Sequence, residues 1–145
     1  PFILCFWIFM RYRDKKYRNM LLILVPITIL CCDQLGGFIK DFGLRDRPWF
    51  ALGLENVRHL GGTGGKNASF PSNHASNISG IAFLFSFIYP HLKHYFWGFA
   101  ILIMFSRIYI GVHFPTDVLM GCILGTIVSY ILIIIYNRIA SNESK

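Results

Sequence analysis

Apolar and polar positions alternate along the chain in long blocks. Five apolar segments cover residues 1–10, 19–38, 74–89, 95–112 and 117–136. A helix that spans a bilayer needs about 20 residues, within a range of roughly 17–25, and the second, fourth and fifth segments meet that length. The third segment is short and starts with polar residues, so we expect its first turns to line a cavity rather than face lipid. Pro26 is expected to kink the second segment.

These segments predict an all-α fold: a polytopic transmembrane helix bundle that forms a single domain over residues 1–145. Because the chain starts inside an apolar run, we expect residues upstream, with room for a sixth segment. Composition supports a membrane protein, since 54% of the residues are hydrophobic and only 14% are charged, against about 25% in soluble domains. The one long connection, residues 44–70, is rich in glycine and is predicted to be irregular.

The distribution of basic residues predicts how the bundle is oriented. Five of them crowd residues 11–18, and the positive-inside rule places that connection in the cytoplasm. Alternate crossings then put residues 40–73 and 113–116 outside and the carboxyl terminus inside. A phosphate-binding site on the outer face explains why six cations lie there against the rule: Lys40, Arg45, Arg47, Arg58, Lys66 and Arg107.

The same features argue against several other classes of protein. The net charge of +7 points to anionic lipid headgroups, and the sequence carries no motif typical of nucleic-acid binding. The four cysteines show no metal-binding spacing, and His91-x2-His94 has no carboxylate nearby, so we expect no metal and no other cofactor. No obligate protein partner is indicated. The glycines at 61–65 resemble a phosphate loop only loosely, because Asn67 stands where such a loop needs Ser or Thr.

The first candidate chemistry lies ahead of the last apolar segment, in Ser106-Arg107-x5-His113-x3-Asp117. Pro115 suits the first position of a helix and Asp117 its first turn, so His113 lies just before a helix N-terminus. Asp117 can accept a hydrogen bond from one ring nitrogen of His113 and leave the other to attack phosphorus. Taken alone, the pattern fits an interfacial histidine with a capping aspartate better.

A second motif, Pro71-Ser72-Asn73-His74, precedes the third segment. Ser72 or Asn73 is an ordinary N-cap in this position. The free N–H groups and the dipole of that helix end also attract a phosphate. His74 is then placed to protonate a leaving oxygen as a general acid.

The third motif, Lys40-x6-Arg47-Pro48, follows the second segment, and Arg107 lies near the end of the fourth. Read singly, these residues are interfacial charges. Together, the three cations can neutralise the charge that is spread over phosphoryl oxygens. The three motifs specify ten positions, each matched by chance about one time in twenty, so joint coincidence is negligible.

In these motifs the chain resembles the type 2 phosphatidic acid phosphatase superfamily of integral membrane lipid phosphatases. That family's signature is K-x6-RP, PSGH and SR-x5-H-x3-D, and all three are present in order over residues 40–117. There is one departure, because Asn73 stands where the family usually has glycine. The resemblance implies a metal-independent, two-step mechanism through a phosphohistidine.

The family's functional residues carry over by position. His113 would be the nucleophile, Asp117 its orienting partner, and His74 the general acid on the leaving group. Ser72 would use both its hydroxyl and its backbone N–H. The residues implied to hold the phosphate are Lys40, Arg47, Ser72, Asn73 and Arg107.

The resemblance implies a lipid phosphomonoester or pyrophosphate that enters from the bilayer, at a site on the periplasmic face of the inner membrane. Arg45, Arg58 and Lys66 suggest a headgroup with more than one anionic group. Lipid A 1-phosphate, undecaprenyl pyrophosphate and phosphatidylglycerol phosphate all fit, and we favour lipid A 1-phosphate. A lipid phosphotransferase remains an alternative. So does a non-enzymatic lipid-binding or transport protein, although it would be expected to lack a catalytic residue.

Overall fold

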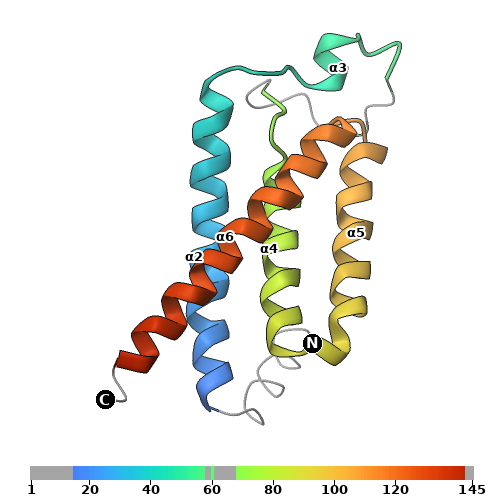
Figure 1. The fold of residues 1–145 in the computed structure, drawn as a ribbon. Coiled ribbons are helices and arrows are strands. Elements are labelled where there is room, and N and C mark those ends of the chain that lie inside the picture. The colour runs from blue at the N-terminus through green and yellow to red at the C-terminus, as the bar shows by residue number, and fades with distance from the viewer. Residues whose placement is uncertain (1–14, 58–59, 61–67, 143–145) are drawn as a thin grey trace.

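The computed structural model describes residues 15–57, 60 and 68–142, and four long helices dominate them (Figure 1). The long connection contains one short helix, α3 (Pro48–Ala51), and a 3-10 turn, η1 (Pro90–Leu92), joins two of the long helices. Within the described residues no strand forms, apart from an isolated bridge between Asp46 and Ala68. The long helices are α2 (Lys15–Asp41), α4 (Asn73–Ile88), α5 (Lys93–Tyr109) and α6 (Pro115–Asn142).

The predicted all-helical architecture is confirmed for these residues, with differences at the helix boundaries. The short third segment matches α4 within one residue at each end. Helix α2 continues without interruption through Pro26, and α6 runs past the apolar segment to Asn142. The predicted first segment, residues 1–10, and the side chains of the basic cluster before Tyr17 lie outside the described residues.

Local chemistry determines where the helices near the motifs begin and end. Ser72 caps α4, because its hydroxyl accepts the N–H of Ala75 at 3.4 Å. Asp117, in the first turn of α6, accepts the N–H of Phe114 through Oδ2 at 2.9 Å, which is half of a capping box. Gly111 has a φ of 73°, a conformation that favours glycine, and it lets the chain turn between α5 and α6.

Helix α4 lies at the centre of the bundle and packs against α2, α5 and α6. Helix α6 runs obliquely across α4 and α2 (Figure 1). The carboxyl ends of α2 and α5 and the amino ends of α4 and α6 all lie at one end of the bundle, beside α3 (Figure 1). This arrangement places the three motifs at one end of the molecule, as the predicted alternate crossings require.

Glycines bring α4 and α6 together at backbone distance. A Cβ added to Gly121 would overlap the carbonyl oxygen of Ser72, and one added to Gly125 would overlap the carbonyl oxygen of Ser76. Small residues that let backbones approach are typical of helix packing within membranes. Helix α4, which begins within the second motif, is therefore in direct backbone contact with α6, which carries Asp117.

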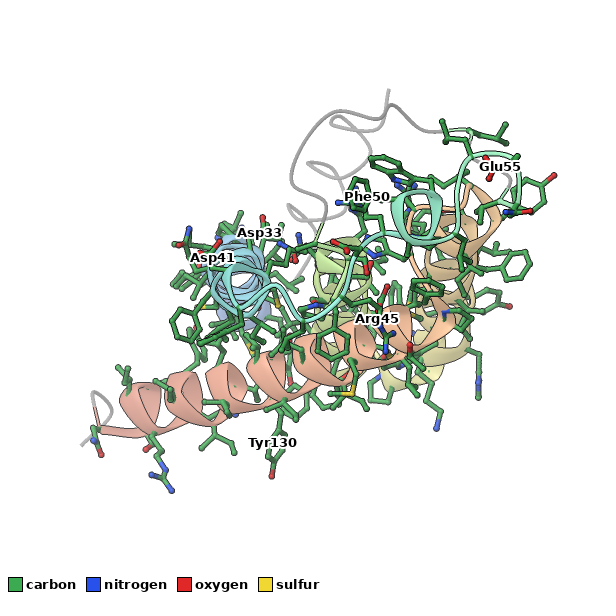
Figure 2. All side chains as sticks on the ribbon, turned by 90° about the horizontal axis from the view of Figure 1, so that it is seen from above. Asp33, Asp41, Arg45, Phe50, Glu55 and Tyr130 are labelled. Atoms are coloured by element: carbon green, nitrogen blue, oxygen red, sulfur yellow. The ribbon has the colours of Figure 1, made fainter. Side chains whose placement is uncertain are left out.

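The interior is rich in hydroxyl groups, while the outer surface is apolar. Ser79 donates to the carbonyl oxygen of Cys122 at 3.1 Å, and Ser129 donates to that of Gly80 at 2.9 Å, so buried serines link α4 to α6. Tyr130 projects outward from α6 (Figure 2). Many large apolar side chains are likewise exposed, among them Leu22, Leu30, Phe99, Leu102, Phe105 and Ile131. This distribution suits lipid as the surrounding medium.

Two of the described helices are long and apolar enough to cross a membrane, α2 over Tyr17–Asp41 and α6 over Pro115–Asn142. Helix α5 has 17 residues and α4 has 16, so they lie at or just below the lower limit for a spanning helix. A polytopic bundle fits these lengths, and the number of crossings stays a prediction.

Candidate active site

Six of the eight residues predicted for the site line a single cavity of about 360 Å³ at the motif-bearing end of the bundle. The remaining walls are the apolar side chains of Ile110 and Val112. The structure therefore brings together side chains from three helices, α2, α4 and α5, and from the connections before α3 and α6. The six predicted residues are Lys40, Arg47, Asn73, His74, Arg107 and His113.

The three cations reach the cavity from different elements. Lys40 comes from the last turn of α2 and Arg107 from the last turn of α5. Arg47 precedes α3 and donates through Nη1 to the carbonyl oxygen of Val112 at 3.2 Å. Burial lowers the pKa of the Arg47 guanidinium, and the nearby Asp117 carboxylate opposes that shift. Arginine starts from so high a pKa that the group stays charged, so the cavity suits an anion.

His113 faces the cavity from the turn before α6, and 5% of its surface is exposed. Its Nδ1 atom lies 3.7 Å from Oδ2 of Asp117, which is within ion-pair range but too long for a hydrogen bond. The predicted hydrogen bond between the two side chains is therefore not formed in this structure. Nδ1 finds no hydrogen-bond partner among the described residues. The geometry nevertheless keeps the Asp117 carboxylate beside one edge of the imidazole ring.

Ser72 lies behind the cavity wall and is fully buried. Its N–H donates to the carbonyl oxygen of Asp117 at 3.0 Å, and its hydroxyl caps α4. The prediction that this N–H binds phosphate is wrong for this structure, because the N–H is already donated. A phosphate contact from the hydroxyl stays a prediction.

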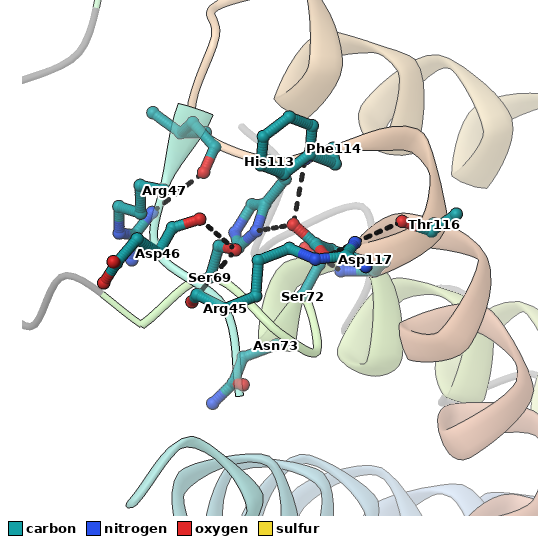
Figure 3. Close-up of polar contacts among 12 residues, drawn as sticks. Arg45, Asp46, Arg47, Ser69, Ser72, Asn73, His113, Phe114, Thr116 and Asp117 are labelled. Atoms are coloured by element: carbon teal, nitrogen blue, oxygen red, sulfur yellow. Dashed lines mark hydrogen bonds and ion pairs between the residues drawn. The ribbon is translucent and has the colours of Figure 1, made fainter. Parts of the chain in front are cut away.

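Arg45 differs most from its predicted role. A second anionic group on the lipid headgroup is the partner that the sequence suggests for it. In the structure its guanidinium instead pairs with Asp117, with Nη1 2.9 Å from Oδ1 (Figure 3). Arg58 and Lys66, the other two cations with that predicted role, lie outside the described residues.

Within the described residues, no three His, Cys, Asp or Glu side chains are placed to hold a metal ion together. Metal independence stays a prediction, since it is a property of the reaction. Chelation is its test.

Asn73 joins Lys40 to an acidic residue of α2. Its Oδ1 atom accepts a hydrogen bond from the Lys40 ammonium, and its Nδ2 donates to Oδ1 of Asp33 at 3.3 Å. Asn77, one turn further along α4, donates to the same oxygen at 3.0 Å. The Asn73 side chain occupies the space above Gly36, where an added Cβ would overlap it. Asp33, which is costly to place in lipid, therefore has partners on a neighbouring helix.

Replacing Asn73 with glycine is expected to weaken substrate binding, because Lys40 then loses the amide that orients it. We expect KM for a phosphorylated substrate to rise about threefold to tenfold with a smaller change in kcat, the net cost of about one ordinary hydrogen bond. Asp33→Asn should raise KM in the natural chain and add little in the Asn73→Gly background. Steady-state kinetics of both single variants and the double variant test the coupling, with Gln34→Ala as the neighbouring control. KM values that are equal in the natural chain, both single variants and the double variant would contradict this coupling between Asn73 and Asp33.

The fold and the cavity define a helical bundle with an apolar outer surface and a cationic, histidine-bearing site at one end. Such a site has the chemical character of a phosphoryl-transfer centre. The sequence matches the PAP2 superfamily over residues 20–140, and the chain belongs to that superfamily. The predicted resemblance to type 2 phosphatidic acid phosphatases is thereby confirmed.

Three relatives are informative. The lipid A 4'-phosphatase of Porphyromonas gingivalis is 34% identical over 137 residues, which are 90% of this chain and 58% of that protein. A lipid A 1-phosphatase of Rhizobium etli is 31% identical over 70 residues, which are 48% of this chain and 30% of that protein. The crystal structure of Aquifex aeolicus LpxE matches with a TM-score of 0.66 at 29% identity, covering 90% of this chain and 75% of that one. The alignments thus cover less than two thirds of the length of either lipid A phosphatase.

Proposed function

We propose that the chain is an integral membrane lipid phosphatase that releases phosphate from a lipid A phosphomonoester through a phosphohistidine on His113. The observation that carries this proposal is the cavity in which two histidines face three cations. The cavity carries positive charge and lies beside the amino end of α4, and helix amino ends bind anions well.

The reaction follows from the placement of the two histidines. The cavity-facing ring nitrogen of His113 attacks phosphorus, so that an N–P bond forms as the P–O bond to the lipid breaks. His74 donates a proton to the departing lipid oxygen, and Lys40, Arg47 and Arg107 neutralise the oxygens of the transferring group. Water, deprotonated by His74, then attacks the phosphohistidine and frees inorganic phosphate.

A lipid substrate is supported by an apolar groove of about 150 Å³ between α2 and α6. Ile39 lies next to Lys40 in the chain, so the groove begins at the end of the bundle that holds the phosphate cavity. The groove is lined by Ile39, Phe70, Pro71, Met120, Ile123, Leu124 and Ile127.

The relatives support lipid A as the lipid and differ on which phosphate is removed. The Porphyromonas gingivalis relative, named for the 4'-phosphate, aligns over far more of this chain than the relative from Rhizobium etli, named for the 1-phosphate. Our sequence-based preference for the 1-phosphate stays a prediction. The distribution of positive charge supports a site on the periplasmic face of the inner membrane.

The test is phosphate release in detergent, with EDTA present, from lipid A, undecaprenyl pyrophosphate and phosphatidylglycerol phosphate. Each lipid is given to the natural chain and to His113→Ala. We expect release from lipid A that survives EDTA and vanishes in the variant, with mass spectrometry of the product identifying the phosphate removed. Release from a different lipid alone would show that lipid A is not the substrate. Release that stops with EDTA would exclude a metal-independent mechanism. An added lipid acceptor that becomes phosphorylated would indicate a phosphotransferase.

A further inference from the structure

Arg45 is built into the site without lining the cavity. Its Nη1 atom lies 2.9 Å from Oδ1 of Asp117 and also donates to the hydroxyl of Thr116 (Figure 3). The Asp117 side chain is fully buried, whereas 40% of the Arg45 side chain is exposed. A buried carboxylate keeps its charge only when it has a partner of this kind. Arg45 therefore supports Asp117 from the side away from the cavity.

Two aromatic rings hold the guanidinium in place. The Cζ atom of Arg45 lies 5.8 Å from the centroid of the Phe70 ring and 5.5 Å from that of Phe114, within the roughly 6 Å of a cation–π contact. The carbonyl oxygen of Arg45 accepts the N–H of Ser69 at 2.8 Å. Arg45 belongs to the first motif, Phe70 precedes the second, and Phe114 lies within the third. The Arg45 side chain thus links the first motif to the third and to the residue before the second. Figure 2 shows Arg45 from above, close to the start of α6.

These contacts fix the orientation of the Asp117 carboxylate. Oδ1 is paired with Arg45, and Oδ2 accepts the N–H of Phe114 at 2.9 Å. Because both oxygens are held, the carboxylate cannot rotate, and Oδ2 stays 3.7 Å from Nδ1 of His113.

We propose that Arg45 is a positioning residue, which holds the Asp117 carboxylate ionised and turned toward His113 without touching the substrate. The inference rests on the proposed function, because it gives Arg45 a part in the reaction of His113. Loss of Arg45 therefore lowers turnover, whereas loss of a cavity cation also weakens substrate binding. The other charged or titratable groups around His113 lie on the cavity side: Lys40, Arg47, His74 and Arg107.

Kinetics of Arg45→Gln, Arg45→Lys, Asp117→Asn and the double variant Arg45→Gln with Asp117→Asn test the proposal. Arg45→Gln is expected to lower kcat about 10-fold to 100-fold, the usual cost of losing a group that orients a catalytic side chain, with KM changed less than about twofold. Arg45→Lys keeps the charge and should recover part of the loss. In the Asp117→Asn background, Arg45→Gln should cost less than about threefold. Arg138→Gln, on the outer surface of α6, is the control for loss of an arginine.

A second measurement, chemical modification of the histidines, does not depend on enzymatic turnover. Diethyl pyrocarbonate modifies neutral imidazole, and mass spectrometry reports its rate at each histidine. Without Arg45, the Asp117 carboxylate is no longer held beside Nδ1 of His113, so the rate at which His113 is modified should change by about threefold in Arg45→Gln. The exposed His91 and His94 serve as internal references. In the Asp117→Asn background the rate should not respond to Arg45.

The outcomes separate this inference from the proposed function. A natural chain that releases no phosphate would overturn the proposed function, while a modification rate that still depends on Arg45 through Asp117 would uphold the coupling. Losses in kcat that simply multiply in the double variant, or a rise in KM alone, would overturn the positioning role. So would a modification rate of His113 that is the same in Arg45→Gln and Arg45→Lys as in the natural chain.

Discussion

Replacing His113 with asparagine is expected to abolish phosphate release from every substrate, by at least about 10³-fold, because no other group then carries the phosphoryl intermediate. Replacing His74 with asparagine is expected to be selective. Release from a lipid alkoxide should fall by about 10²–10⁴-fold, the usual contribution of a general acid. Release of p-nitrophenolate from p-nitrophenyl phosphate in the first turnover should fall far less, because this leaving group departs without a proton and before water attacks the phosphohistidine.

The measurement compares the first-turnover rate of leaving-group release for the two variants on lipid A and on p-nitrophenyl phosphate in the same detergent. Acid quenching with labelled substrate adds a direct count of phosphohistidine, which should be absent in His113→Asn. His91→Asn and His94→Asn are matched controls, because His91 lies in η1 and His94 in the first turn of α5, both exposed and away from the cavity. Equal losses on both substrates for His74→Asn would remove it as the general acid. Activity that persists in His113→Asn would remove the nucleophile.

The second large effect is expected from Gly125→Val, far from the cavity. A valine Cβ there would overlap the backbone of Ser76, which a change of rotamer cannot relieve. We expect a loss of at least about 3 kcal/mol in stability, at the upper end of overpacking costs, and a loss of most of the activity. Activity falls because α6 carries Asp117 and α4 carries His74, so that separating the two helices takes the site apart.

Gly98→Val in α5 is the matched control, because nothing lies within 4 Å of a Cβ built at Gly98. Thermal unfolding in detergent, followed by size-exclusion chromatography of the heated samples, should place the Gly98 variant close to the natural chain and the Gly125 variant far below it. A Gly125→Val variant that unfolds and turns over like the natural chain would show that α4 and α6 do not meet at backbone distance.

Much of the site could be predicted from the sequence, because its residues lie at helix ends that local chemistry defines. Ser72 is an N-cap, Pro115 suits a first turn, and the apolar segments stop where the motifs begin. Alternate crossings then bring those ends together. The carboxyl end of α6 was harder to predict. A helix can continue through polar residues once its backbone hydrogen bonds are formed, whereas the apolar segment marks only the part of the helix whose side chains suit lipid.

The pairing of Arg45 could not be predicted in the same way. A basic residue in an outer loop has the same sequence context whether it meets a phosphate or a carboxylate, and Asp117 lies 72 residues further along the chain. Asn73 presents the same limit. Its link to Asp33 depends on the close approach of α2 to α4 above Gly36, and no local pattern reports that approach.

The exposed leucines, isoleucines and phenylalanines have a consequence for handling the protein. Its interior is held by backbone contact and serine hydrogen bonds, so the surrounding acyl chains act as the solvent to which this fold is adapted. When lipid or detergent is removed, the apolar outer surfaces of separate molecules associate with one another. Loss of activity on dilution out of detergent should then reflect association of intact bundles rather than their unfolding.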